Sequence, residues 1–337
     1  PKAILDKEID LIRDIGITFV NNFHIGSDTT LTRLRADFDA VVLAAGAWKS
    51  TKMRIDGEDS AGVLGGIDFL RDVALGEPPH IGQRVAVCGG GNTAMDACRT
   101  AVRLGADKVY VIYRRTRNEM PAEDIEIEEA EEEGVIFKFL TNPSELLIED
   151  GTLKGVKLQL MELGEPDAGG RRKPVPIEGA FETIDLDTLI IAIGQQTDVC
   201  GLEALAMTKW STVIADEATF MTSEEGIFAI GDVTNNGADI AITAIGEAHK
   251  AADVIDTYLK GDAVPYKKPY VVEKEVTAED FADRPKLARA KMPHTPAEER
   301  KHSFCEVNWG YAEDVAKAEG ARCLECGCHD FFECKLI

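Results

Sequence analysis

Residues 85–96 read VAVCGGGNTAMD, and this stretch decides the fold because it joins a strand to a helix through three glycines. Its first residues are apolar and predict a buried strand, whereas residues 92–104 carry the apolar spacing of a helix. Gly89, Gly91 and Ala94 fill the three small-residue positions of the dinucleotide-binding fingerprint. A tight structural turn is the other interpretation of such glycines. We expect a pyrophosphate at the helix N-terminus, held by Gly89, Gly90, Gly91, Asn92, Thr93 and Ala94.

The next predicted strand, residues 108–113, ends in Arg114 and Arg115. An NAD site usually carries an acidic residue about 20 residues after the glycines, where it binds the ribose 2′-hydroxyl. Arginines suit a 2′-phosphate instead, because their planar forks donate paired hydrogen bonds to phosphate oxygens. A solvated basic strand end is the alternative. We predict NADP(H) rather than NAD(H), with Arg117 able to assist.

Composition limits the classes of partner. The chain has 337 residues and a formal net charge of -23, which argues against nucleic acid and anionic membranes as partners. No apolar run is long enough to span a bilayer, and no signal peptide opens the chain. The 8 cysteines therefore indicate a reducing compartment, and we expect a cytoplasmic protein without disulfides. The acidic run at residues 123–133 (EDIEIEEAEEE) predicts the solvated face of a helix.

The remaining pattern predicts further strands, helices and connections. Residues 1–16 predict an amphipathic helix, residues 17–20 a short strand, and residues 47–80 a loop-rich connection. Residues 145–163 and 175–187 alternate apolar and polar side chains, which is typical of an antiparallel meander. These segments surround a βαβ unit over residues 84–115, which requires a parallel sheet.

A second glycine-containing strand end lies at residues 226–233 (GIFAIGDV). This strand is expected to end at Gly231 and Asp232, before a long helix over residues 240–259. A simple β-turn is the alternative for these two residues. Two similar strand ends, LAAGA at residues 43–47 and IIAIGQQTD at residues 190–198, flank the first motif.

These motifs resemble the small (beta) subunit of NADPH-dependent glutamate synthase and its relatives, which share the glutathione-reductase fold. The matching stretches run from PKAILDKEID at residues 1–10 to about residue 259, and include YRR at residues 113–115 and TRNEMPA at residues 116–122. The resemblance implies oxidation of NADPH by FAD, with electrons passed to iron–sulfur centres and a redox partner subunit or ferredoxin-like protein. It implies no catalytic side chain, because hydride transfer is the cofactors' own chemistry.

The resemblance also assigns residues on the flavin side. Asp232 would accept a hydrogen bond from the ribityl chain, and Ile242 with Thr243 would lie under the flavin pyrimidine. The implied cofactor-binding residues outside the first motif are Ala45, Gly46, Gly194, Gly231, Asp232, Ile242 and Thr243.

The expected fold is α/β, with two dinucleotide-binding domains, one inserted into the other, and a C-terminal arm. Residues 1–79 would form the first part of the FAD-binding domain with its crossover, and residues 80–195 the NADP(H)-binding domain. Residues 196–262 would complete the FAD domain, and residues 263–337 would form the arm with its cysteine-rich tail. The family's first FAD fingerprint is absent, so we expect an FAD domain incomplete at its N-terminus that binds FAD less well than NADPH.

The tail RCLECGCHDFFECKLI contains four cysteines with the spacing C-x2-C-x-C-x5-C. Thiolates this close converge on one soft centre. Structural zinc usually uses two C-x-x-C pairs separated by a longer loop, so the compressed spacing favours a [4Fe–4S] cluster, with zinc or free thiols as alternatives. The predicted metal ligands are Cys323, Cys326, Cys328 and Cys334.

Two other functions remain open at this stage. One is an NADH-linked flavoprotein subunit of a hydrogenase or formate-type complex, which nucleotide preference would distinguish. The other is a non-catalytic electron-transfer or docking scaffold with vestigial dinucleotide sites. Arg114 and Arg115 beside intact glycines argue against a vestigial site.

Overall fold

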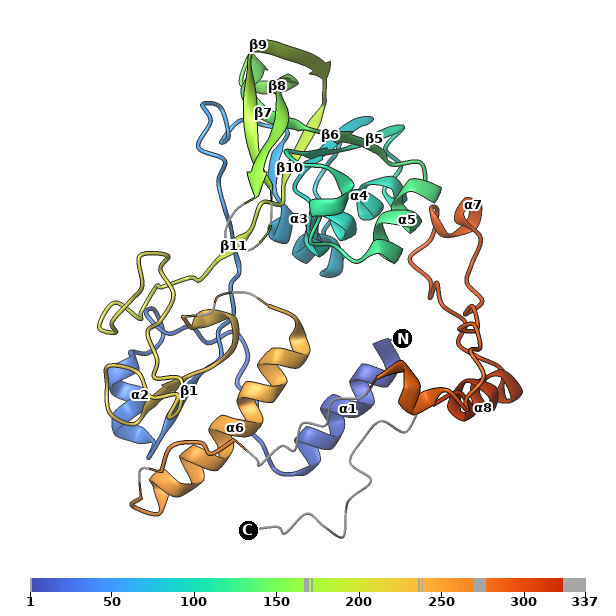
Figure 1. Cartoon of the computed structure of the whole chain (residues 1–337). Helices are drawn as coiled ribbons and strands as arrows, with labels where there is room; N and C mark the ends of the chain where they lie inside the picture. The colour runs from blue at the N-terminus through green and yellow to red at the C-terminus, as the bar shows by residue number, and fades with distance from the viewer. Residues whose placement is uncertain are drawn as a thin grey trace.

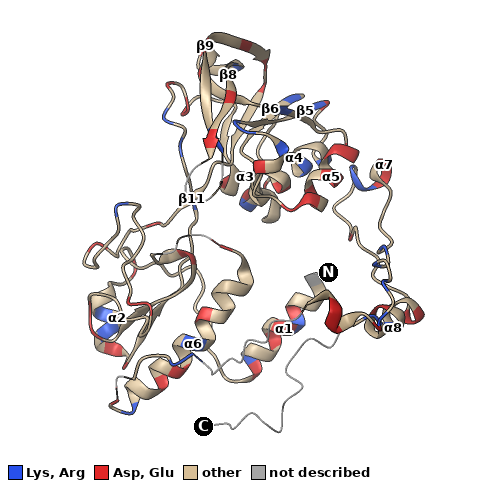
Figure 2. Ribbon diagram, viewed as in Figure 1, with Lys and Arg blue, Asp and Glu red and all other residues tan. Residues whose placement is uncertain are grey.

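The computed structural model describes residues 2–166, 170, 172–235, 237, 239–262, 264–268 and 277–323. Two α/β lobes are joined by a narrow waist of two extended segments (Figure 1). Acidic and basic side chains are spread over both lobes, and acidic ones dominate α5 (Figure 2). Among the described residues, no helix is both long and apolar enough to cross a bilayer.

A parallel five-stranded sheet forms the centre of the first lobe, in the order β3-β10-β4-β5-β6. Its strands are β3 (Val63–Gly65), β4 (Arg84–Cys88), β5 (Lys108–Tyr113), β6 (Ile136–Phe139) and β10 (Thr188–Ile191), and the helices of this lobe are α3 (Gly66–Ala74), α4 (Asn92–Arg103) and α5 (Asp124–Glu132). Val85 and Val87 pack toward the helix α4, whereas Ala86 and Cys88 pack toward the opposite face. Successive residues of β4 are therefore buried on opposite faces of the sheet, which is covered on both sides.

An antiparallel three-stranded sheet covers that opposite face. It consists of β7 (Thr141–Glu149), β8 (Thr152–Pro166) and β9 (Arg172–Asp185), in that order. Leu153, Val156 and Leu158 of β8 pack in one buried cluster with Ala86 and Ile112 of the parallel sheet. The predicted meander is confirmed.

The second lobe is built around a parallel pair of strands, β1 (Val41–Leu43) and β12 (Ile227–Ala229). Its helices are α2 (Leu31–Asp37), the 3₁₀ turn η2 (Gly231–Val233) and the long α6 (Ala241–Leu259), while α1 (Lys2–Asp14) lies apart from the two strands (Figure 1). Leu43, Val213 and Ala229 belong to one buried cluster, and Phe228 packs with Val254 of α6 in another.

The waist consists of β2 (Lys49–Ser50) and β11 (Gln195–Gln196), which pair antiparallel. Lys49 Nζ lies 2.7 Å from Asp198 Oδ1 and links the two segments a second time.

The C-terminal arm contains η3 (Ala278–Phe281), α7 (Ala297–Arg300) and α8 (Glu313–Ala321), and it brings α7 beside α5 of the first lobe (Figure 1).

Two of the expectations drawn from the sequence were wrong, and both concern residues that precede the glycine turn. Within the described chain, residues 17–20 form no strand, because they pair with no other segment. Residues 63–74 are not a loop-rich connection: β3 pairs with β10, and α3 follows it directly. A three-residue strand is too short to show an apolar period. The four-part domain division stays a prediction, and β3 lies in the same sheet as strands of residues 80–195.

Candidate functional site

The turn between β4 and α4 needs its first two glycines because neighbouring atoms lie very close. Gly89 has a φ of +149°, and a Cβ there would lie 2.2 Å from the carbonyl oxygen of Ala192. A Cβ on Gly90 would lie 2.5 Å from the ring of Tyr113. The turn is therefore held tightly between β10 and β5.

The third glycine faces open space instead. Gly91 precedes α4, and a Cβ there would meet only the Pro121 ring, at 3.8 Å. No described side chain caps this helix N-terminus, so its first N–H groups are left for an anion. Ala94 is fully buried, which lets α4 pack closely on the sheet. This arrangement matches the roles expected for the three small residues.

The arginines that follow β5 differ in their partners. Arg115 Nε donates to the carbonyl oxygen of Arg172 at 2.7 Å. Arg117 pairs with Glu131 at 2.6 Å, and that hydrogen bond raises its pKa. Arg114 is exposed and makes no hydrogen bond or ion pair with any described residue. Among the described contacts, Arg114 is thus the arginine of the three with all its side-chain donors available to a ligand, whereas Arg115 has committed its Nε.

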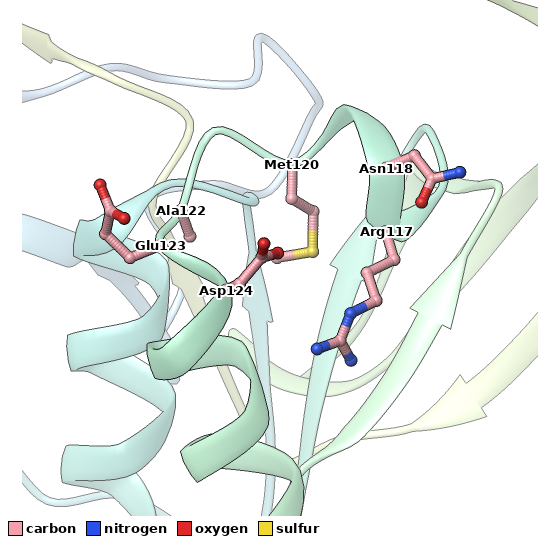
Figure 3. A pocket seen from close by; sticks show the side chains of 6 residues that line it. All are labelled: Arg117, Asn118, Met120, Ala122, Glu123 and Asp124. Carbon is pink, nitrogen blue, oxygen red and sulfur yellow. The ribbon is translucent and has the colours of Figure 1, made fainter. Parts of the chain in front are cut away.

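A cavity of about 370 Å³ lies beside the glycine turn. It is lined by Arg117, Asn118, Met120, Ala122, Glu123 and Asp124, and Figure 3 shows the Met120 side chain between Asp124 and Arg117. The loop that carries these residues begins with η1 (Arg117–Glu119). Two hydrogen bonds attach it to the turn: Ala122 N–H to Gly90 O at 3.2 Å, and Glu123 N–H to Asn92 Oδ1 at 3.3 Å. The TRNEMPA segment is therefore a wall of this site.

The waist segment that follows β10 reaches the N-terminus of α4. Gln195 Nε2 donates to Thr93 Oγ1 at 3.4 Å, and Thr51 N–H donates to Gly194 O at 3.1 Å. Gly194 has a φ of +136°, which favours glycine. The structure thus brings Gln195, the neighbour of Gly194, into contact with Thr93. In the other waist segment, which runs from β1 to β2, Ala45 and Gly46 follow β1, and Gly46 has a φ of +69°.

The second lobe has a separate glycine turn, which follows β12 and is held against α6. Gly231 has a φ of +69°, and its N–H donates to Glu247 Oε2 at 2.6 Å. Asp232 Oδ1 accepts the N–H of Asp239 at 3.1 Å, while Ile242 and Thr243 are exposed on the first turn of α6. An exposed apolar side chain beside a helix N-terminus fits a planar ligand that carries negative charge on one edge. Sequence reasoning missed Glu247, which holds this turn.

The cysteines divide into buried and exposed groups. Burial raises the pKa of the Cys88 and Cys98 thiols to about 12, as expected for core residues. Cys323 is exposed, and its carbonyl oxygen accepts a hydrogen bond from Arg284 at 2.8 Å. Cys326, Cys328 and Cys334 lie outside the described residues, and the described part of the chain contains no group of side chains able to hold a metal.

Sequence reasoning also missed a buried cluster of charged side chains between α4, the end of α5 and the C-terminal arm. Glu133 was expected on a solvated helix face, but its side chain is fully buried and the expectation was wrong. Arg103 and Arg99 contact its carboxylate at 2.7 and 2.8 Å, and Arg300 of the arm contacts it at 2.8 Å. The arm therefore docks on the first lobe through this carboxylate.

The profile of the pyridine nucleotide-disulphide oxidoreductases matches residues 13–251. The chain belongs to this family. It is similar in structure to Mycobacterium tuberculosis FprA in complex with NADPH, with a TM-score of 0.61, 19% identity, and coverage of 71% of this chain and 68% of that one. The expected two-domain oxidoreductase fold is confirmed.

Two curated relatives of this family member are informative. The NADP(+)-dependent formate dehydrogenase subunit beta of Moorella thermoacetica is 40% identical over 340 residues, covering 97% of this chain and 48% of the relative. The glutamate synthase [NADPH] small chain of Escherichia coli (strain K12) is 36% identical over 277 residues, covering 77% and 58%. The predicted resemblance is confirmed, and the chain spans about half the length of these relatives.

Proposed function

We propose that this chain is the NADP(H)- and flavin-binding part of an oxidoreductase that passes electrons from NADPH through FAD to iron–sulfur centres and a partner subunit. The observation that carries the nucleotide assignment is Arg114, which has no described partner and follows β5. It stands at the strand end where the 2′-position of the ribose is read, next to an uncapped helix behind an intact glycine turn.

The residues on the two sides of the waist have distinct tasks in this proposal. Gly89, Gly90, Gly91, Asn92, Thr93 and Ala94 hold the pyrophosphate, with Arg114 and the less available Arg115 at the 2′-phosphate. Asp232, Ile242 and Thr243 hold the flavin end, supported by Gly231 and by the crossover residues Ala45, Gly46 and Gly194. FAD, when bound, would accept a hydride and release single electrons.

The tail cysteines Cys323, Cys326, Cys328 and Cys334 are proposed to hold a [4Fe–4S] cluster. The compressed C-x2-C-x-C-x5-C spacing supports this assignment, and zinc is the second candidate. The names of the two relatives, subunits of a formate dehydrogenase and of a glutamate synthase, support a partner subunit as acceptor. The same names specify NADP, which favours NADP(H) over the NADH-linked alternative. We place the protein in the cytoplasm.

The experiment that tests this function is an absorption spectrum of anaerobically purified protein, supplied with FAD and recorded before and after addition of NADPH. Flavin bands that bleach with NADPH and not with an equal concentration of NADH support the proposal. A broad brown shoulder supports a cluster on the tail. Protein that binds no NADPH and retains neither chromophore would contradict the proposed function.

A further inference from the structure

A second cavity, of about 530 Å³, lies at the waist of the molecule. Its lining residues are Lys49, Ser50, Thr51, Lys52, Arg54, Asp68 and Gln196. The cavity adjoins the nucleotide site: the N–H of Thr51 donates to Gly194 O, and Gln196 follows Gln195, which contacts Thr93 at the N-terminus of α4. None of these lining residues belongs to the fingerprint or to the arginine pair.

Arg54 is presented to this cavity by a strained turn. Its φ is +66°, a left-handed conformation that side-chain-bearing residues rarely adopt. The Glu58 carboxylate enforces the turn, because it accepts the N–H groups of Met53 at 2.8 Å and Ile55 at 2.5 Å, on either side of Arg54. Met53 and Ile55 pack against the buried cluster around β8, so Arg54 is left facing outward. Such strain persists only where the surroundings impose it.

The charge at Arg54 is uncompensated. The other two cations of the cavity are paired, Lys49 with Asp198 at 2.7 Å and Lys52 with Asp59 at 2.6 Å. Asp68, the acidic lining residue, accepts from Ser50 and from Arg71, both at 3.0 Å. Arg54 makes no hydrogen bond or ion pair with a described residue. The cavity therefore presents one free guanidinium group in a strongly acidic chain.

The sheet order says which part of a dinucleotide would reach this cavity. Arg114 at the end of β5 marks the 2′-phosphate of the adenosine half, and the glycine turn at the end of β4 marks the pyrophosphate. The strand on the other side of β4 is β10, so the strand order reverses between β4 and β10, where ligands of such sheets bind. This order leaves the end of β10, beside Gly194 and the waist cavity, for the nicotinamide half.

We propose that the waist cavity receives the nicotinamide half of NADP(H), and that Arg54 makes the site prefer the reduced over the oxidised nucleotide. The guanidinium group attracts the phosphate of that half in both forms. The oxidised nicotinamide ring carries a positive charge that the reduced ring lacks, so Arg54 repels the ring of the oxidised form alone, and this repulsion offsets part of its attraction for the phosphate. This inference rests on the proposed function. It assigns Arg54 the roles of positioning the nicotinamide half and of favouring the release of NADP⁺ after hydride transfer.

The test measures dissociation constants of the full chain for NADPH, NADP⁺ and adenosine 2′,5′-bisphosphate, which lacks the nicotinamide half, by calorimetry. Arg54→Gln removes the charge. Arg54→Gly also removes it and suits the left-handed backbone, so it guards against misfolding. In both variants we expect NADPH to bind about fivefold more weakly and the preference for NADPH over NADP⁺ to fall about threefold. Adenosine 2′,5′-bisphosphate should bind unchanged, as should all three ligands to the control Arg33→Gln, an exposed arginine of α2.

Two results would overturn the inference while leaving the proposed function intact. One is an unchanged preference between NADPH and NADP⁺ in both Arg54 variants. The other is an equal loss of affinity for all three ligands, which would place Arg54 outside the nicotinamide half. Failure of the wild-type chain to bind any of the three ligands would instead overturn the proposed function itself.

Discussion

Arg300 Nε donates a 2.8 Å hydrogen bond to Glu133 Oε1, and both side chains are almost completely buried. The contact joins the C-terminal arm to the lobe that carries the glycine turn. Arg103 adds a second link, because its Nε donates to the carbonyl oxygen of Ser303 at 3.0 Å. A carboxylate surrounded by three guanidinium groups is stable only while its partners are present, since each buried charge depends on the others.

Arg300→Met should therefore destabilise the protein. Removing one partner of a buried ion pair costs about 3 to 5 kcal/mol, and we expect the low end because Arg99 and Arg103 still contact Glu133. The free energy of unfolding, measured by urea titration, checks this. Lys317→Met is the control, because Lys317 pairs with Glu313 on an exposed face of α8 and should cost less than about 0.5 kcal/mol. Equal losses in the two variants would contradict the interpretation.

Glu133 should also make stability depend on pH. Burial opposes ionisation of its carboxyl, but hydrogen bonds from Arg103, Arg99 and Arg300 outweigh burial and lower its pKa from 4.5 to about 2. A group whose pKa is lowered by folding stabilises the folded state above its unfolded pKa. That contribution, about 3 kcal/mol, is lost as the pH falls from about 4.5 toward 2. Urea titrations from pH 6 to pH 3 should show a smaller decline for Glu133→Gln than for wild type, and parallel curves would refute this.

Arg114 and Arg117, which both follow β5, should have unequal effects on nucleotide binding. Arg114→Gln is expected to weaken NADPH about tenfold or more, through loss of a charge-assisted hydrogen bond, and to leave NADH unchanged. Arg117→Gln should change neither nucleotide by more than about twofold, because its guanidinium is already paired with Glu131. Fluorescence titrations with both nucleotides measure this. An equal loss of NADPH and NADH binding in Arg114→Gln would exclude the 2′-phosphate assignment.

The features that the sequence predicted correctly depend on neighbouring residues. The turn from β4 to α4 needs consecutive small residues, and the meander and α6 show their periods within one segment. The Glu133–Arg300 contact joins residues 167 positions apart, so no local pattern marks it. Arg54 was missed for a related reason: its conformation is imposed by the carboxylate of Glu58, and nothing in the residue itself favours a left-handed backbone. Strand β3 was missed because three residues and a following glycine show no period.

Two glycines of the turn should affect different quantities: Gly89 the stability of the fold, and Gly91 the affinity for NADPH. Gly89→Ala should cost about 2 to 4 kcal/mol of unfolding free energy, because the new Cβ would lie 2.2 Å from the Ala192 carbonyl oxygen on a backbone with φ of +149°. Gly91→Ala should leave stability within about 0.5 kcal/mol, because the nearest atom is 3.8 Å away and φ is −96°. The methyl group would nevertheless stand where a pyrophosphate approaches the backbone, so NADPH affinity should fall about tenfold. Urea titration and calorimetry on both variants measure the two quantities. If Gly91→Ala bound NADPH as tightly as wild type, the pyrophosphate would have to lie elsewhere, and the function proposed for this turn would be wrong.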